Sequence, residues 1–295
     1  MEETSLSVVV ISHNEGKYLR RTVESLAQGL PGDGEMIVVD DGSTDGSTRG
    51  LHAAYEKVRV LHPPKRLGAA VARNFGARRA SGKIVLFSDA HVEALSDWAQ
   101  PMADALAPSA VGAVGPTLTS MLHPEAKGYG LRFADAGLNI EWLDLKGPKP
   151  YPVPLLGGFF LAMRRDVFKS TGGFDSGMSI WGMEDLELCV RLWTFGYKCL
   201  LLPGVDVAHL DRQPETYPDY QCDWETGVHN VLRMAILHFG SERIERVLRH
   251  YGQDEVLPHA LVRLIVSDAW ERRRRFDKAR QLDDDWYFRR FRMEL

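Results

Sequence analysis

The sequence predicts an α/β fold: a mostly parallel sheet flanked by helices, followed by a helical C-terminal extension. Short apolar segments rich in β-branched residues alternate with segments of helical periodicity up to about residue 90. These apolar segments are nearly continuous, which is typical of parallel strands covered on both faces. After Trp224 only helical periodicity is left. We therefore expect two domains, residues 1–213 with the sheet and residues 214–295 with helices alone.

The first domain begins with strands and helices in alternation. The expected strands are residues 6–12, 35–40, 58–62 and 83–88. The expected helices are residues 15–29, 44–57 and 68–80. Ligands bind beyond the carboxyl ends of such strands. Three of these ends are polar here, namely Ser-His-Asn-Glu (12–15), Asp-Asp-Gly-Ser-Thr-Asp (40–45) and Asp-Ala-His (89–91). We expect a functional crevice at this edge of the sheet.

The alternation becomes less regular after residue 100. A strand is expected at 111–118, and residues 120–155 are rich in Gly and Pro, as in long functional or mobile loops. An apolar segment at 157–163 leads to an amphipathic helix that begins near Met183. The last strand is expected at 199–202. The helices of the extension are expected at residues 224–239, 241–251 and 254–276.

Composition excludes several classes of protein. Hydrophobic residues make up 44% of the 295 and charged residues 26%, which is ordinary for a folded soluble protein. Lys and Arg number 36 against 40 Asp and Glu, a net charge of -4, so nothing suggests nucleic-acid binding. The three cysteines are too few for a disulfide scaffold, and we expect a cytoplasmic protein. No apolar stretch is long enough for a transmembrane segment, although peripheral membrane association through the basic C-terminal end stays open.

The Asp-Ala-His triplet is the first candidate for chemistry. Asp89 and His91 are two residues apart at a strand end, so their side chains project from one face of the pleat. A carboxylate and an imidazole suit a divalent cation such as manganese or zinc. His209, just beyond another strand, is the candidate third ligand. The alternative is a plain polar loop, because aspartate is frequent in turns.

Asp40 and Asp41 follow an apolar strand and enter a turn that leads into a helix. Capping of that helix would explain one of them. Two adjacent carboxylates repel each other, however, so at least one needs a partner. A ribose hydroxyl or a nucleobase N–H would serve.

A group of acids opens the helix that follows Trp181 and Gly182. Acids in a first helical turn commonly interact with the helix dipole, an account that suits Glu187. The helix dipole does not explain the Trp-Gly pair. A tryptophan beside a carboxylate is a frequent way to hold a sugar ring. We therefore expect Trp181 and Gly182 to bind an acceptor. Glu184 or Asp185 would accept the proton of an attacking hydroxyl.

Arg73 and the arginines at 272–275 each have an ordinary and a functional interpretation. Arg73 lies in a helix whose apolar face is made of alanine and valine. It is either a solvated helix residue or a guanidinium fixed near a diphosphate. The four arginines at 272–275 are more typical of a solvated helix face than of a lipid or nucleic-acid patch.

Six motifs stand in order between residues 6 and 212. They are Val-Val-Ile-Ser-His-Asn-Glu (9–15), Val-Val-Asp-Asp-Gly-Ser-Thr-Asp (38–45), Gly-Ala-Ala-Val-Ala-Arg-Asn-Phe-Gly (68–76), Phe-Ser-Asp-Ala-His (87–91), Gly-Gly-Phe-Asp (172–175) and Trp-Gly-Met-Glu-Asp-Leu-Glu (181–187). Each is loose alone, but six in this order are highly specific. Together they resemble the family 2 glycosyltransferases with the GT-A fold. The resemblance implies transfer of a sugar from a nucleotide sugar, by preference a UDP-sugar, to a hydroxyl or other nucleophile of an acceptor.

The resemblance also implies roles for the donor site. The residues that would contact the nucleotide are Ile11 through its backbone, Glu15, Asp41 on uracil or ribose, and Arg73. Gly157 and Gly158 match a glycine pair that lets the backbone approach the donor sugar.

The metal motif of the family more often reads Asp-x-Asp, where this chain has Asp89 and His91. The histidine form is shared with polypeptide N-acetylgalactosaminyltransferases, in which a later histidine completes the metal site. Val-Ala-His-Leu-Asp-Arg at 207–212 is similar to that later segment, which favours His209 as the third ligand. The expected cofactor is a divalent metal, Mn²⁺ with Mg²⁺ as the alternative, and it would also place Asp89 at the donor.

Stereochemistry separates two lineages. Polypeptide N-acetylgalactosaminyltransferases retain the anomeric configuration and carry asparagine at the position of Asp185. Inverting family 2 enzymes carry aspartate there and use it as the base. We therefore expect inversion, with the retaining enzyme as the alternative.

The acceptor stays open between a peptide, a saccharide and a small molecule, because motifs fix donor chemistry better than acceptor identity. The helical extension could hold that acceptor or form a homodimer. A nucleotidyltransferase is a second enzymatic class to consider. Such an enzyme would carry a Gly- and Arg/Lys-rich signature after the first strand, and Ser-His-Asn-Glu at 12–15 is not that signature. A non-catalytic nucleotide-sugar-binding module would have little use for both a metal triad and a carboxylate beside Trp181.

Overall fold

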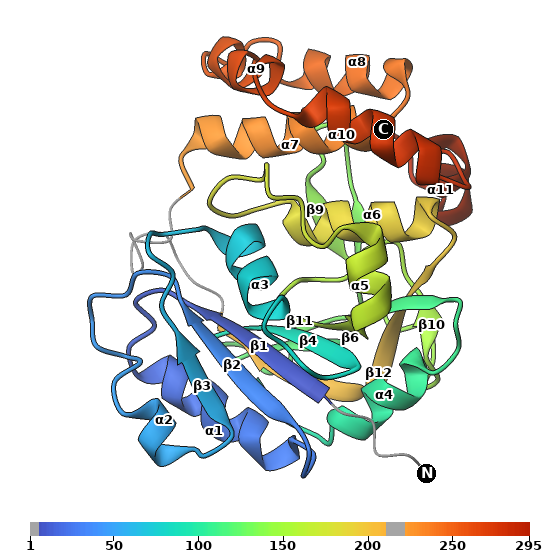
Figure 1. The fold of residues 1–295 in the computed structure, drawn as a ribbon. Coiled ribbons are helices and arrows are strands. Elements are labelled where there is room, and N and C mark those ends of the chain that lie inside the picture. Colours follow the sequence, from blue (N-terminus) through green and yellow to red (C-terminus); the bar gives the residue numbers. More distant parts are fainter. Residues whose placement is uncertain (1–5, 211–221) are drawn as a thin grey trace.

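A single large sheet forms the centre of the protein, with helices on both of its faces and a layer of helices above one of them (Figure 1). The computed structural model describes residues 6–210 and 222–295. The main path of the sheet consists, in spatial order, of β10 (Tyr151–Pro152), β12 (Lys198–His209), β6 (Val111–Ser120), β11 (Phe160–Arg164), β4 (Ile84–Asp89), β1 (Leu6–Ser12), β2 (Glu35–Asp40) and β3 (Val58–Leu61). Two short strands extend it, β5 (Val92–Ala94) beside β12 and β7 (Lys127–Gly128) beside β6.

The main strands are mostly parallel. β4, β1, β2 and β3 form one parallel group, and β12 runs parallel to β6. Between these groups β11 is antiparallel to both neighbours. This mixed, mostly parallel arrangement confirms the predicted fold class, and it brings the carboxyl ends of β1, β2 and β4 to one edge.

Each face of the sheet has its own hydrophobic core because side chains alternate along a strand. One face of β1 carries Val8 and Val10, and they pack with the helices α1 (Lys17–Gly29) and α4 (Ala99–Leu106). The other face carries Val9, which packs with α3 (Ala69–Ala77), α5 (Arg165–Thr171) and α6 (Glu184–Thr194). All three valines are fully buried. Such burial contributes about 1.5–3 kcal/mol for each side chain.

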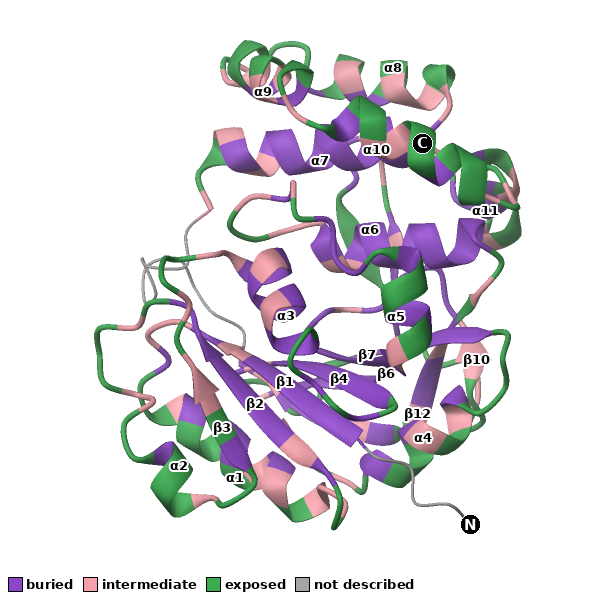
Figure 2. Ribbon diagram, in the orientation of Figure 1, coloured by how far each residue is buried: buried purple, intermediate pink, exposed green. Residues whose placement is uncertain are grey.

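The helical extension is joined to this second core. Its helices are α7 (Trp224–His238), α8 (Ser241–His250), α9 (Leu257–Ile265), α10 (Ala269–Ala279) and α11 (Asp284–Phe291). Figure 2 shows α7 as mostly buried, between α6 and the outer helices. Most of its buried apolar residues belong to the same hydrophobic cluster as α6 and the sheet. The expected division between residues 213 and 214 lies outside the described residues and stays a prediction. None of the described helices combines the length and apolar character needed to cross a membrane.

A predicted helix and a predicted strand of the first domain have different bounds in the structure. The helix expected at 44–57 is reduced to α2 (Leu51–Ala54), because Gly46 and Gly50 adopt positive φ angles of 73° and 76°. The strand expected to stop at 202 continues as β12 to His209, with an irregularity between Leu202 and Asp206 that absorbs the Pro-Gly pair.

The C-terminal helices were also predicted incompletely. The single helix expected at 254–276 is divided into α9 and α10 at Ser267. The Ser267 hydroxyl donates to the carbonyl of Leu264 and accepts from the amide of Ala269, which replaces helical hydrogen bonds at this point. α11 was not predicted. The Gly- and Pro-rich stretch at 120–155 contains a small hairpin of β8 (Leu131–Phe133) and β9 (Ile140–Trp142).

Candidate metal and donor site

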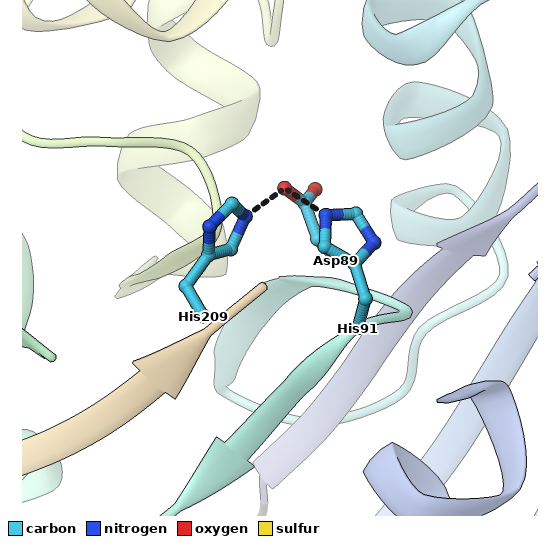
Figure 3. A group of neighbouring side chains, drawn as sticks. All are labelled: Asp89, His91 and His209. Carbon is cyan, nitrogen blue, oxygen red and sulfur yellow. Dashed lines mark ion pairs between the residues drawn. The ribbon is translucent and has the colours of Figure 1, made fainter. Parts of the chain in front are cut away.

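Asp89, His91 and His209 lie together at the edge of the sheet, as expected (Figure 3). Asp89 is the last residue of β4, and His209 is the last residue of β12. Antiparallel pairing of β12 with β5 brings His209 beside His91, and the amide of Leu210 donates to the carbonyl of His91. Oδ2 of Asp89 is 3.5 Å from Nε2 of His209 and 3.9 Å from Nε2 of His91.

These three residues fit a divalent cation. Their candidate ligand atoms all lie within 4.8 Å of one another. Bonds of about 2.0–2.2 Å to nitrogen and oxygen would therefore be reached by small side-chain movements. One carboxylate and two imidazoles suit manganese or zinc, and three protein ligands leave positions for a substrate.

Glu15 lies behind His91. Its side chain is fully buried, and Nδ1 of His91 is 3.2 Å from Oε2 and 3.3 Å from Oε1. A carboxylate that accepts from one imidazole nitrogen orients the ring and leaves the other nitrogen for a metal. The structure thus places Glu15 against a candidate metal ligand, and its predicted contact with the nucleotide stays a prediction.

Arg73 connects the metal group to the start of α6. Its side chain is 2% exposed, so the solvated alternative is excluded. One guanidinium nitrogen donates to Asp89 at 2.8 Å and to the Gly158 carbonyl at 3.2 Å, and the other donates to Glu184 at 2.6 Å. Burial alone would raise the pKa of Asp89. The hydrogen bond to His209 and the charge of Arg73 outweigh burial and hold that pKa well below its usual range.

Asp185 has a different environment from Glu184. The amide of Gly158 donates to Oδ2 of Asp185 at 2.6 Å, and the amide of Leu186 donates to Oδ1 at 2.9 Å. Burial and the neighbouring Glu184 charge raise the pKa of Asp185 to about 6, although Arg73 opposes them. Glu184 already accepts from Arg73 and from the amide of Gly182. Asp185 is therefore the better placed of the two predicted catalytic acids for proton transfer near neutral pH.

Gly158 fits between two of these side chains only because it has no Cβ. A Cβ there would lie 2.9 Å from Cβ of Asp185 and 3.2 Å from a guanidinium nitrogen of Arg73. Gly158 thus packs closely against Asp185 and Arg73, and its predicted approach to the donor sugar stays a prediction.

Glu187 is not explained by the helix dipole. It is fully buried and pairs with Arg191 at 2.6 Å and with Nε2 of His238 at 2.7 Å. His238 comes from α7, so this buried group joins α6 to the extension. Burial alone would raise the pKa of Glu187, but the charge of Arg191 and the hydrogen bond to His238 outweigh burial and lower this pKa to about 2.

Two of the residues predicted to contact the nucleotide, Ile11 and Asp41, lie at the ends of β1 and β2. Ile11 on β1 is in register with Val39 on β2 and with Asp89 on β4. Asp41 is buried and accepts from the amides of Leu67 at 2.6 Å and Gly68 at 2.9 Å.

Asp40 also has partners within the protein. It accepts from the amide of Ser43 and from the hydroxyl of Thr48. Both adjacent carboxylates are thus bonded inside the protein, so their proximity does not require a nucleotide. The contact of Asp41 with uracil or ribose stays a prediction.

The predicted acceptor residues lie in a loop before α6. Trp181 is 58% exposed, and Gly182 has a φ of 100°. Ile180 and Met183 also have positive φ angles, of 54° and 74°. This conformation costs a side-chain-bearing residue about 1–2 kcal/mol, and it is a genuine outlier for a β-branched residue such as Ile180.

Sequence reasoning missed two residues that hold this loop, Asn230 and Arg233 on α7. Both are fully buried. Asn230 binds the backbone near Trp181, and Arg233 binds both oxygens of Asp175 at 2.6 and 3.0 Å. An Asn and an Arg three residues apart, among the apolar residues in the second half of this helix, were the available signal.

Comparison with known proteins identifies the family to which these motifs correspond. The sequence model described as "Glycosyl transferase family 2" matches residues 7–172. Human "Polypeptide N-acetylgalactosaminyltransferase 15" is 32% identical over 257 residues, which cover 80% of this chain and 40% of the relative. "Putative polypeptide N-acetylgalactosaminyltransferase 13" of Drosophila melanogaster is 29% identical over 327 aligned residues, which cover 99% of this chain and 57% of the relative. The chain thus spans about half the length of these relatives.

Solved structures show the same fold. The "Crystal structure of GalNAc-T7 with UDP, GalNAc and Mn2+" has a TM-score of 0.81 at 22% identity, covering 98% of this chain and 57% of that one. "Mannosyltransferase PcManGT from Pyrobaculum calidifontis in complex with GDP-Man and Mn2+" has a TM-score of 0.52 at 18% identity. It covers 93% of this chain and 74% of that one. The fold expected from the motifs is therefore confirmed as GT-A-like.

Proposed function

This chain belongs to glycosyl transferase family 2, and we propose that it transfers a sugar from a UDP-sugar to an acceptor hydroxyl in a metal-dependent reaction. The observation that carries the proposal is the Asp89–His91–His209 group beside Arg73 at the carboxyl edge of the sheet. UDP-N-acetylgalactosamine is the first donor to test, and a serine or threonine hydroxyl of a peptide is the first acceptor, because the relatives are named polypeptide N-acetylgalactosaminyltransferases.

The proposed metal is Mn²⁺, which two of the similar structures contain. When bound by Asp89, His91 and His209, it would supply positive charge to the diphosphate of the donor. Glu15 would hold His91 in the orientation that leaves Nε2 toward the metal. Arg73 would fix Asp89 and add a guanidinium beside the leaving diphosphate.

In the proposed reaction, the bond from the anomeric carbon to the diphosphate oxygen breaks and its electron pair leaves with the diphosphate. A new bond forms from the anomeric carbon to the acceptor oxygen, which loses its proton. Trp181 and Gly182 would contact the acceptor, because Trp181 is exposed beside the acids of α6. Ile11 and Asp41 would contact the nucleotide at the ends of β1 and β2.

We propose that the transfer retains the anomeric configuration. The similarity to polypeptide N-acetylgalactosaminyltransferases favours the retaining alternative over the inversion expected from Asp185. Retention in one step requires the acceptor to enter on the face from which the diphosphate leaves. The proton of the acceptor then lies beside a departing phosphate oxygen, and no carboxylate base is required.

One observation supports inversion as a second candidate. Asp185 has a pKa raised to about 6, which suits a general base near neutral pH. In that mechanism the acceptor would attack from the face opposite the diphosphate, and Asp185 would take its proton.

Two measurements test the proposed function. The first is sugar release from a panel of nucleotide sugars with Mn²⁺ and with a chelator, for which we expect release from a UDP-sugar only with the metal. If no donor in the panel gave metal-dependent sugar release, the transferase proposal would be wrong and a non-catalytic nucleotide-sugar-binding module would be the alternative. The second is the anomeric configuration of the product, determined by proton NMR. A product with the same configuration as the donor shows retention, and a product with the opposite configuration shows inversion.

A further inference from the structure

We infer that Asn230 on α7 is a positioning residue for transfer, because it sets the conformation of the segment 179–183 that carries Trp181. This inference rests on the proposed function. It gives the helical extension a role in the reaction, although all six family motifs lie earlier in the chain, between residues 9 and 187. Asn230 itself is fully buried and lies outside the site, so it acts through the backbone that it binds.

The side-chain amide of Asn230 binds the segment at four points. Its nitrogen lies 2.9 Å from the Ser179 carbonyl, 3.2 Å from the Trp181 carbonyl and 3.0 Å from the Gly182 carbonyl. Its oxygen accepts from the amide of Ser179 at 3.0 Å. Only a side chain with both a donor and an acceptor on one planar group can make this set of contacts.

The segment needs an external hold because three of its residues have positive φ angles. Ile180, Gly182 and Met183 are all in this region, where only glycine is unstrained. Such conformations persist only where surrounding contacts determine them. Asn230 supplies the contacts on the side of the extension, since it binds the carbonyls on both sides of Ile180.

The opposite side of the segment rests on α3. The amide of Ala69 donates to the Ile180 carbonyl at 2.7 Å. A Cβ on Gly68 would lie only 2.8 Å from that same carbonyl oxygen, so the two backbones approach as closely as a glycine permits. The segment is therefore fixed between the N-terminus of α3 and the middle of α7.

The conformation of the segment is transmitted to the metal group by a continuous chain of hydrogen bonds. The amide of Gly182 donates to Glu184 at 2.8 Å, Glu184 accepts from Arg73, and Arg73 donates to Asp89. A displaced Gly182 would therefore change the position of Glu184 and Arg73 as well as that of Trp181.

The test is Asn230→Asp in the full chain. The substitution keeps size and the acceptor for Ser179, but it turns a carboxylate oxygen toward the three carbonyls. Two quantities are compared with the native chain in Mn²⁺: the Kd for UDP by calorimetry, and kcat for sugar release from UDP-N-acetylgalactosamine, normalised to the UDP-binding sites present. We expect kcat to fall about tenfold or more and the UDP affinity to fall by a clearly smaller factor, because Arg73 and Asp89, which would hold the diphosphate, stand at the far end of the hydrogen-bond chain.

Arg273→Ala is the matched control. Arg273 donates to the carbonyls of Ile236 and Phe239 at the far end of α7, so its loss loosens the same helix without touching the segment. We expect a lower thermal midpoint with both Kd and normalised kcat unchanged. If Asn230→Asp fails to fold, Arg263→Ala replaces it, because Arg263 donates to the Ser179 hydroxyl from a partly exposed position and should lower kcat in the same direction.

The outcomes separate the inference from the proposed function. A normalised kcat that equals the native value, or a UDP affinity that falls at least as much as kcat, overturns the positioning role of Asn230 while the proposed function stands. A native chain that binds UDP but releases no sugar overturns the proposed function, and the inference falls with it.

Discussion

The amide nitrogen of Gly158 donates to Oδ2 of Asp185 at 2.6 Å, a contact that joins the loop before β11 to the first turn of α6. It fixes the carboxylate of a predicted catalytic acid whose pKa burial and the neighbouring Glu184 charge raise to about 6. Whatever role Asp185 has in transfer, its carboxylate is already oriented before a substrate enters. Two substitutions examine this contact from its two sides.

Asp185→Asn distinguishes the two stereochemical mechanisms. The amide oxygen can still accept from Gly158, whereas the hydrogen bond from Leu186 is lost, at a cost of about 1 kcal/mol in unfolding free energy. For a retaining enzyme we expect kcat for transfer to stay within about tenfold of native with unchanged UDP affinity. A loss of about 10²–10⁴-fold in kcat would instead identify Asp185 as a general base. Stopped assays of product, with UDP affinity measured in parallel, check this.

Gly158→Ala should be harmful because its methyl group has no room. The methyl would lie 2.9 Å from Asp185 and 3.2 Å from Arg73, both of which are held by several hydrogen bonds. We expect a destabilisation of about 1–3 kcal/mol in urea unfolding and a large loss of sugar release. Gly227→Ala on α7, where a Cβ meets nothing within 4 Å, is the control. It should be stabilising or neutral, and equal behaviour of the two variants would contradict the packing argument.

Glu15→Gln should weaken metal binding without removing a ligand. The neutral amide holds His91 less firmly than the buried carboxylate, and changes of this kind typically cost about 10–100-fold in metal affinity. Calorimetric titration with Mn²⁺ measures the effect. His209→Ala should abolish the binding measured in the same way. Glu93→Gln, on a neighbouring strand and paired with Arg21 at the surface, should leave the affinity unchanged.

The buried Glu187–His238 pair should make stability fall as pH is lowered. Burial lowers the pKa of His238 by more than the hydrogen bond to Glu187 raises it. His238 therefore takes up a proton in the unfolded chain at a pH at which it stays neutral in the folded chain. The stability present above the unfolded histidine pKa of about 6.5 is therefore lost as pH falls below it. The lowered pKa of Glu187 extends the loss to more acid pH. Between pH 7.5 and 5.5 we expect a fall of about 1 kcal/mol from His238.

Urea unfolding in the presence of a chelator measures this dependence. His238→Gln keeps a donor for Glu187 but does not titrate, so its stability should change less over the same range. His123→Gln, at a side chain that is 71% exposed, should follow the native curve. A native curve that is flat between pH 7.5 and 5.5 would contradict the assignment.

Local pattern was sufficient for the sheet and for the metal group. The strands near β1, β2 and β4 are continuous apolar runs, and the polar residues at their ends converge because parallel strands share one edge. The triplet at 89–91 could be read from spacing alone. His209 was proposed as the third ligand from its place after a strand-like run, and the resemblance favoured it, although the strand itself had been expected only at 199–202.

Contacts between distant segments could not be predicted. Arg73 was ambiguous in the sequence because its partner Glu184 is 111 residues away. Asn230 carried no motif, and its partners lie in a loop 48–51 residues earlier. Helix breaks set by single side chains, as at Ser267, were also beyond the periodicity argument. For Arg73 and Asn230 a tertiary contact supplied what local propensity left undetermined, whereas at Ser267 a local side-chain hydrogen bond overrode the helical periodicity.

The separation of the candidate metal ligands along the chain has a kinetic consequence. Asp89 and His209 are about 120 residues apart and meet only after β4, β6, β11 and β12 have assembled. Closing so long a loop costs entropy that local structure cannot recover early, so the three ligands converge late in folding. A metal that binds these residues together thus recognises only chains in which the sheet is complete. Uptake of Mn²⁺ during refolding would time the final assembly of the sheet.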